Sequence, residues 1–310
     1  MDFTFITLLA VFGLQQATTI GIAAQGELIT EKSGILNIGI EGSMLMSAFM
    51  AGIANVLFEP YLGTSAPMAA LAAGALVGVL TNFFFAVLST KMHVDQVIAG
   101  VGINIFGLGI TYVLSALHVA GSTIDGTQPA FQVKPVFYVA IGSSKLALGI
   151  SPLTLLMLVL PIATLLFLNR TKLGLHIRAA GENPKAAEAA GLGVARIRIT
   201  ATCLGGALLG VAGSYLSIDI SPQFTPNVTA GVGFIAIAAV IAGAWKPYNT
   251  LAVSLIFGAC LGLAYAPGVP TGPLKYLVTV LPYLITVAML AIASRRLRSP
   301  AALALPYKKE

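Results

Sequence analysis

Long stretches without a charged residue dominate the chain. Asp, Glu, Lys and Arg are absent from residues 3–26, 60–90, 96–124, 146–169, 199–218, 220–245, 247–274 and 276–294, and 42–58 is a shorter gap after Glu41. These runs are continuous, whereas the strands of a transmembrane barrel alternate apolar and polar positions. A bilayer core of ~30 Å requires ~20 apolar residues per helix. The pattern therefore predicts nine membrane helices, near 4–25, 36–58, 66–89, 95–117, 151–169, 197–218, 228–245, 249–267 and 274–294.

Composition supports an all-α integral membrane protein, a polytopic helical bundle forming a single transmembrane domain over residues 1–310. Of its residues 57% are hydrophobic and 9% are charged, whereas a soluble domain carries roughly 25% charged residues. The chain therefore has too little polar surface for a soluble enzyme, a disordered protein or a nucleic-acid-binding domain. The N-terminal run lacks a basic flank, so we expect a first helix there and not a removable signal peptide.

The basic residues predict the orientation, because Lys and Arg accumulate on the cytoplasmic side. With nine spans and a cytoplasmic C-terminus, only Lys134, Lys145 and Lys275 of the 17 basic residues lie outside. The net charge of +6 then reflects topology and requires no nucleic-acid partner. We expect an external N-terminus and a cytoplasmic side that carries Lys32, Lys91, Arg170, Lys172, Arg178, Lys185, Arg196, Arg198, Lys246, Arg295, Arg296, Arg298, Lys308 and Lys309.

Cysteine and histidine residues predict neither a metal site nor a cofactor. Cys203 and Cys260 both lie in predicted helices and are interpreted as small core residues. His93, His118 and His176 are scattered, and no two lie at metal-ligand spacing.

Three polar residues inside the predicted membrane helices are candidates for a translocation pathway or gate. Asn37 and Glu41 lie four residues apart and share a helix face, and Asn104 is a further candidate in the fourth span. A charged residue in the bilayer is costly and usually faces the bundle interior. The alternative interpretation makes Glu41 a structural acceptor near the membrane surface. Gln15 and Gln16 in the first span are equally consistent with hydrogen bonds between helices.

Glycines recur four residues apart, which lets helices approach closely. The pairs are Gly74 with Gly78, Gly206 with Gly210 and Gly258 with Gly262.

The longest predicted cytoplasmic loop, residues 170–196, contains a short helix of its own. Asn183 is a favourable N-cap and Pro184 a favourable first helical residue. Residues 185–190 are helix formers, and Gly191 ends the helix. Because two turns are marginally stable alone, we expect this helix to dock into a groove on another protein. The alternative is a surface helix on the membrane face. The other polar segments are the outer loop 119–150 and the basic tail 295–310.

Four segments resemble permeases of ABC importers, in the branch that includes ribose-type and branched-chain amino-acid-type permeases. They are GLHIRAAGENPKAAEAAGLGVARIR at 174–198, GGALLGVAGSYL at 205–216, EKSGILNIGIEGSMLM at 31–46 and AGVGFIAIAAVIAGAWKP at 230–247. The last segment is similar to the simple-sugar or nucleoside subgroup, which often has a polar or charged residue where this chain has Val232. The resemblance implies a multi-pass protein of a bacterial or archaeal cytoplasmic membrane.

The resemblance also implies partners. These are a cytoplasmic ABC ATPase subunit, a second permease subunit (the same chain or a different one) and an extracytoplasmic solute-binding protein. The chain has no G-x-x-x-x-G-K-[ST] loop, so ATP hydrolysis is expected in the separate ATPase. The resemblance assigns coupling to this ATPase to Gly181, Glu182, Asn183, Pro184, Ala186, Ala187 and Gly191.

The expected function is translocation of a small polar solute, a nucleoside or a simple sugar, with a branched-chain amino acid as the alternative. A secondary transporter driven by an ion gradient is a second alternative, but it usually needs titratable groups deep in several helices. In this chain only Glu41 and Asp219 come close to being titratable groups deep in a helix. A membrane-embedded enzyme would need a catalytic constellation on adjacent helices, and the sequence shows none.

Overall fold

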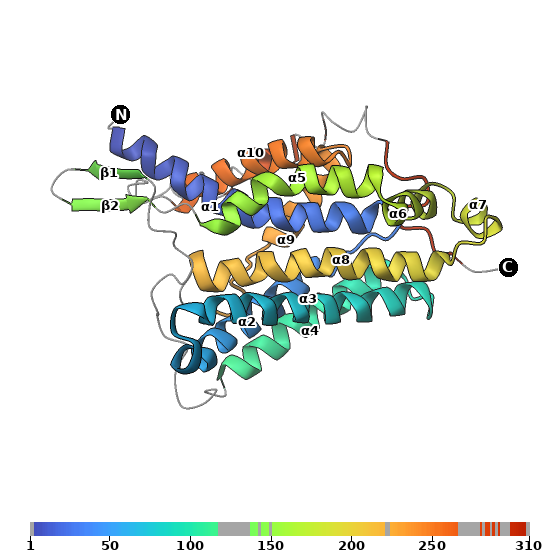
Figure 1. Cartoon of the computed structure of the whole chain (residues 1–310), viewed down its shortest axis with the longest axis horizontal. Helices are drawn as coiled ribbons and strands as arrows, with labels where there is room; N and C mark the ends of the chain where they lie inside the picture. The colour runs from blue at the N-terminus through green and yellow to red at the C-terminus, as the bar shows by residue number, and fades with distance from the viewer. Residues whose placement is uncertain are drawn as a thin grey trace.

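The computed structural model describes residues 3–116, 137–141, 144–148, 151–220, 224–265 and 298–307, with short helical pieces between 280 and 291. Long helices run along the longest axis of the molecule (Figure 1). The small hairpin of β1 (Phe137–Ile141) and β2 (Ser144–Leu148) lies at one end of this axis, where α1 (Phe3–Glu31) begins. The short helices α6 (Lys172–Glu182) and α7 (Pro184–Ala189) lie at the other end. The two ends of the bundle therefore differ in structure.

Most described helices lie close to the predicted apolar runs, but the first continues to Glu31, and a helix at Lys172–Glu182 lies in the loop 170–196, where only one short helix was predicted. Ser151 caps α5 by accepting a hydrogen bond from the Leu153 N–H, and Thr171 caps α6 in the same way through the Gly174 N–H. The helices are α1 (Phe3–Glu31), α2 (Ile40–Leu62), α3 (Ala66–Thr90), α4 (Gln96–Ala116), α5 (Pro152–Arg170), α6 (Lys172–Glu182), α7 (Pro184–Ala189), α8 (Val194–Tyr215), α9 (Val232–Ala242) and α10 (Pro247–Tyr265).

Five helical stretches of the described chain are long and apolar enough to cross a membrane. The first stretch, Ile40–Thr90, contains both α2 and α3, which the 3₁₀ turn Gly63–Ser65 separates. The others are Gln96–Ala116, Pro152–Arg170, Val194–Ile220 and Pro247–Ala264.

The predicted span 228–245 is wrong in length. Its helix α9 covers only 11 residues, and at 1.5 Å per residue it extends roughly 16 Å, about half the thickness of a bilayer core. The chain approaches α9 through turns at 226–231, where Gly231 has a positive φ of 87°. The ninth predicted span, 274–294, falls largely outside the described residues.

A two-stranded hairpin in the loop 119–150 is an exception to the helical architecture that the sequence did not predict. Strand β1 (Phe137–Ile141) pairs antiparallel with β2 (Ser144–Leu148), and Tyr138 lies opposite Ala147. The rest of this loop up to residue 150 lies outside the described residues.

All three predicted glycine pairs lie where two helices make close antiparallel contact. A Cβ added to Gly78 of α3 would lie 2.2 Å from the carbonyl oxygen of Gly206 in α8, and one added to Gly210 would lie 2.4 Å from that of Gly74. Helices α10 and α1 repeat this arrangement, because a Cβ on Gly258 would lie 2.4 Å from the Cα of Ala17. Close packing of the two backbones thus holds α3 against α8 and α1 against α10, as in many membrane bundles.

The distribution of side chains is that of a membrane protein. Large apolar side chains are exposed on the outer faces of α3, α4 and α5, for example Phe84, Ile105 and Val159. Polar side chains such as Gln25 and Asn82 are buried inside the bundle together with Tyr215 and Phe257. Exposed apolar surface of this extent is suited to lipid or to another membrane subunit.

Candidate functional site

The short helix predicted in the loop 170–196 is present as α7, at the end of the molecule away from the hairpin (Figure 1). The Asn183 side chain accepts a hydrogen bond of 3.0 Å from the Ala186 N–H, and Pro184 is the first helical residue. Gly191 ends the segment with a φ of 82°. Glu182, Asn183, Ala186 and Gly191 are exposed, and Pro184 is half-buried. The predicted cap and stop are therefore confirmed.

Two residues assigned to coupling face the protein itself. Ala187 is only 4% exposed and belongs to the main hydrophobic core, because it lies on the inner side of α7. Gly181 is buried, and a Cβ there would lie 2.2 Å from the carbonyl oxygen of Lys32. Ala187 therefore cannot contact a partner directly as α7 stands, whereas Ala186 is exposed. Burial lowers the pKa of the Lys32 amino group, while the nearby carboxylate of Glu182 acts in the opposite direction.

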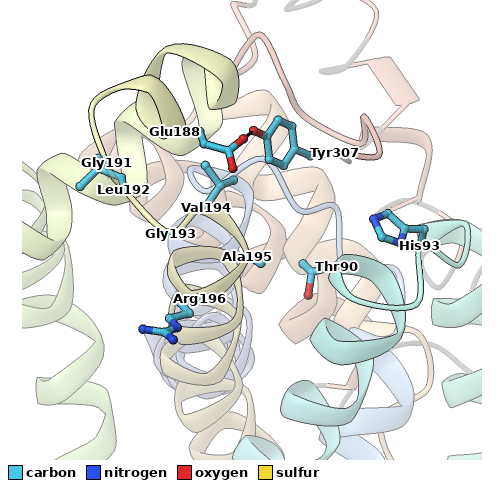
Figure 2. A pocket seen from close by; sticks show the side chains of 10 residues that line it. All are labelled: Thr90, His93, Glu188, Gly191, Leu192, Gly193, Val194, Ala195, Arg196 and Tyr307. Atoms are coloured by element: carbon cyan, nitrogen blue, oxygen red, sulfur yellow. Dashed lines mark hydrogen bonds between the residues drawn. The ribbon is translucent and has the colours of Figure 1, made fainter. Parts of the chain in front are cut away.

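A cleft of about 700 Å³ lies beside α7. Figure 2 shows that the phenol of Tyr307 meets the carboxylate of Glu188 there, and that the start of α8 forms one wall. The Tyr307 hydroxyl donates a hydrogen bond to Glu188 Oε2. No local sequence pattern connects the parts of this cleft, which is lined by Thr90, His93, Glu188, Gly191, Leu192, Gly193, Val194, Ala195, Arg196 and Tyr307.

Glu41 joins the beginnings of two helices. It lies in the first turn of α2, and its carboxylate accepts hydrogen bonds of 2.7 Å from the Gly231 N–H and 2.8 Å from the Gly233 N–H at the start of α9. A carboxylate at this position also stabilises the positive end of the α9 dipole. Val232, the position at which the sugar and nucleoside subgroup often differs, lies between these two donors.

The other two pathway candidates also lie at the start of α2. Asn104 of α4 accepts a hydrogen bond of 2.7 Å from the Gly42 N–H and donates one of 2.9 Å to the Ile38 carbonyl. The Asn37 side chain donates to Asn82 Oδ1 at 2.7 Å. Asn37, Glu41 and Asn104 therefore surround one helix start. The prediction that Asn37 and Glu41 share a helix face is wrong, because α2 begins only at Ile40 and Asn37 lies in the turn before it.

Several buried polar partners of this region were not predicted from the sequence. Glu27 Oε1 accepts a 3.1 Å hydrogen bond from the Asn37 N–H, and the indole N–H of Trp245 donates to Glu31. Both carboxylates have an exposed fraction of 0%. They were missed because the first helix was expected to end near residue 25, whereas α1 continues to Glu31. Their spacing of four residues was the available signal.

The remaining titratable candidates that the structure describes do not assemble into a site. Within the described residues no group of three His, Cys, Asp or Glu side chains could hold a metal ion. Cys260 is buried, Cys203 is half-buried and both are free. His93 lines the cleft beside α7, and His118 lies outside the described residues. Asp219 is buried in the π-helical turn Leu216–Ile220 that follows α8.

Long apolar helices, a polar interior and a short exposed helix at one end are the features of a multi-pass membrane permease. The family of permease components of branched-chain amino acid transport systems matches residues 9–292. The chain belongs to this family.

Several relatives are similar over nearly their full length. The guanosine ABC transporter permease protein NupQ of Bacillus subtilis is 29% identical over 303 residues, covering 96% of this chain and 95% of the relative. A nucleoside ABC transporter permease of Lactococcus lactis is 30% identical, covering 92% and 91%. A protein of Haloferax volcanii, provisionally named a glucose ABC transporter permease, is 33% identical, covering 96% of each chain.

Proposed function

We propose that this chain is the permease subunit of an ATP-driven importer and forms the path for a nucleoside or a simple sugar. The observation that carries this proposal is the near-full-length similarity to permeases named for guanosine, for nucleosides and for glucose. The buried polar groups around the start of α2 support it, because a path for a polar solute through a bilayer requires polar groups inside the bundle.

The end that carries α7 is proposed to face the cytoplasm. Lys32 follows α1, Lys91 follows α3 and Arg170 ends α5, so these basic residues gather at the α7 end, whereas Lys145 lies in the hairpin. This asymmetry agrees with the accumulation of basic residues on the cytoplasmic side of membrane proteins. An external N-terminus and a cytoplasmic C-terminus follow.

Helix α7 is proposed to dock on a cytoplasmic ABC ATPase subunit. Its exposed side carries small and polar residues, Lys185, Ala186 and Ala189, and its cap holds it in a defined place. The importer would be completed by a second permease subunit and an extracytoplasmic solute-binding protein. A separate ATPase is expected because the chain has no P-loop of its own, and the family resemblance implies the other two partners.

The meeting point of α2 and α9 is proposed to be the gate. Two helices begin inside the bundle, and Glu41 links them through two backbone N–H groups. Discontinuous helices whose ends meet inside the membrane are a recurrent way to build transporter sites. Opening would require the hydrogen bonds of Glu41 to break, and Asn37 and Asn104, which surround the same helix start, are proposed to move with it.

Purification of a tagged form of the chain from its native membrane tests the proposal. We expect an ATPase subunit to co-purify, and we expect ATP-dependent uptake of labelled guanosine by vesicles that contain the complex. Inhibition of this guanosine uptake by unlabelled glucose or by unlabelled leucine identifies the substrate class. Competition by leucine alone would support the branched-chain amino acid alternative that the family description suggests. An absence of any co-purifying ATPase would contradict the proposed function.

A further inference from the structure

The described part of the C-terminal tail, residues 298–307, is bound along the α7 end of the molecule, and we call it the C-terminal strap. Its backbone donates hydrogen bonds from Ala302 to the Gly181 carbonyl at 2.8 Å and from Ala304 to the Gly34 carbonyl at 3.2 Å. Ala302 is buried. The strap therefore joins the end of α6 to the turn between α1 and α2.

Arg198 of α8 connects the strap to the same turn. Its Nε donates to the Ser33 carbonyl and its Nη1 to the Leu305 carbonyl, both at 3.2 Å, and its guanidinium lies 6.0 Å from the centre of the Tyr307 ring. This charged side chain is only 2% exposed. Buried charges of this kind are kept where several acceptors hold them. The position of Arg198 is thus set jointly by the strap and the turn.

The far end of the strap reaches α7. Tyr307 packs against the main core and donates its hydroxyl proton to Glu188 of α7 (Figure 2). Helix α7 has six residues, which is too short to be stable by itself. Its position therefore depends on the groups that hold it, and Tyr307 is one of them.

The middle of the strap lies next to the turn that leads to the proposed gate. The turn of residues 32–39 contains Ser33 and Gly34, which the strap and Arg198 hold, and leads directly to Asn37 and Glu41. A Cβ on Gly34 would lie 2.7 Å from Arg198 Nη2. A displacement of α7 would thus move the start of α2, because Tyr307, Arg198 and the turn of residues 32–39 connect the two.

We propose that Tyr307 and Arg198 are positioning residues that transmit movement of α7 to the turn between α1 and α2, so that the strap couples ATP hydrolysis to opening of the gate. This inference rests on the proposed function, because it takes α7 as the docking element for the ATPase. The hydrogen bond from Tyr307 to Glu188 is the removable part of the link.

The test compares solute transported per ATP hydrolysed by the full complex in proteoliposomes. Tyr307→Phe removes the hydroxyl but keeps the ring near Arg198. We expect ATPase association and hydrolysis to be retained while solute moved per ATP falls by about tenfold, as for loss of one hydrogen bond to a charged group. Glu188→Ala should act in the same way, whereas Glu188→Gln keeps an acceptor oxygen and should retain coupling. Tyr248→Phe, at an exposed position of α10, is the matched control.

The outcomes separate the two proposals. An unchanged ratio in both Tyr307→Phe and Glu188→Ala would overturn the role of the strap while leaving the proposed function intact. A parallel loss of thermal stability, ATPase association and uptake would also overturn it, because the contact would then serve only folding. Absence of ATP-driven uptake by the wild-type complex would refute the proposed function itself, and the strap's role with it.

Discussion

Glu41 shows how one charged residue can be kept inside an apolar bundle. Its two carboxylate oxygens accept one backbone N–H each at the start of α9, so the charge is balanced by donors that α9 would otherwise leave unpaired. The sequence showed that Glu41 is unusual, because no other acidic residue lies in the first half of α2. It could not show the partners, which are 190 and 192 residues away.

Glu41→Gln should impair uptake while leaving membrane insertion intact. A glutamine amide offers one acceptor oxygen for two N–H donors, so one donor at α9 loses its partner at a cost of about 1–3 kcal/mol. The measurement is solute uptake together with thermal unfolding of the purified protein. Glu59→Gln makes the same substitution on an exposed turn of α2 and should leave both quantities unchanged. Uptake at the wild-type rate by Glu41→Gln would exclude a role for the carboxylate in the gate.

At the scale of elements, the long helices were predictable from the charge-free runs and α7 from its cap, whereas α6 and several helix ends were not. The cap Asn183–Pro184 and the stop at Gly191 placed α7 correctly. Which side of α7 faces inward was not predictable, because the four alanines of this segment look alike in sequence. The length of α9 was overestimated because its apolar approach, residues 224–231, has no charge to mark a break.

Substitutions on the two sides of α7 should behave differently. Ala186 is exposed, so Ala186→Arg should leave the permease folded but weaken its association with an ATPase. Ala187 is buried in the core, so Ala187→Arg should lower the stability of the chain itself by several kcal/mol, as for burial of an unpaired charge. Thermal unfolding and ATPase pull-down of each variant distinguish the two effects. Equal behaviour of both variants would contradict the orientation of α7.

The contact between α3 and α8 should be intolerant of even one added methyl group. Gly78→Ala would place a Cβ 2.2 Å from the Gly206 carbonyl, so the helices must separate. We expect a loss of about 1–3 kcal/mol, typical of overpacking, as a lower melting temperature in detergent. Gly109→Ala in α4 is the matched control, because nothing lies within 4 Å of its added Cβ. A melting temperature for Gly78→Ala equal to that of the control would contradict the observed packing.

At the scale of the whole molecule, the sequence predicted a multi-pass membrane protein, and its basic residues predicted an orientation. The pairing of α1 with α10 and of α3 with α8 was not predictable, because glycine spacing marks a close contact without naming the partner helix. The tail was interpreted only as a basic segment, whereas its residues 298–307 bind α6, α7 and the turn after α1.

Labelling of single cysteines tests the orientation. In a variant without Cys203 and Cys260, Lys145→Cys should react with a membrane-impermeant maleimide on intact cells, because β2 is placed outside. Lys185→Cys on α7 should react only after the cells are opened. Labelling of position 185 from outside would invert the topology and remove α7 from the reach of a cytoplasmic ATPase.

The proposed role of the chain is tested most directly by energised uptake in proteoliposomes. The purified complex is compared with the permease reconstituted alone, with labelled guanosine outside and either ATP or an ion gradient as the energy source. We expect accumulation only with the ATPase, its ATP and the solute-binding protein present, and abolished accumulation when the permease carries Ala186→Arg. Accumulation by the permease alone, driven by an ion gradient without ATP, would contradict the assignment and identify a secondary transporter.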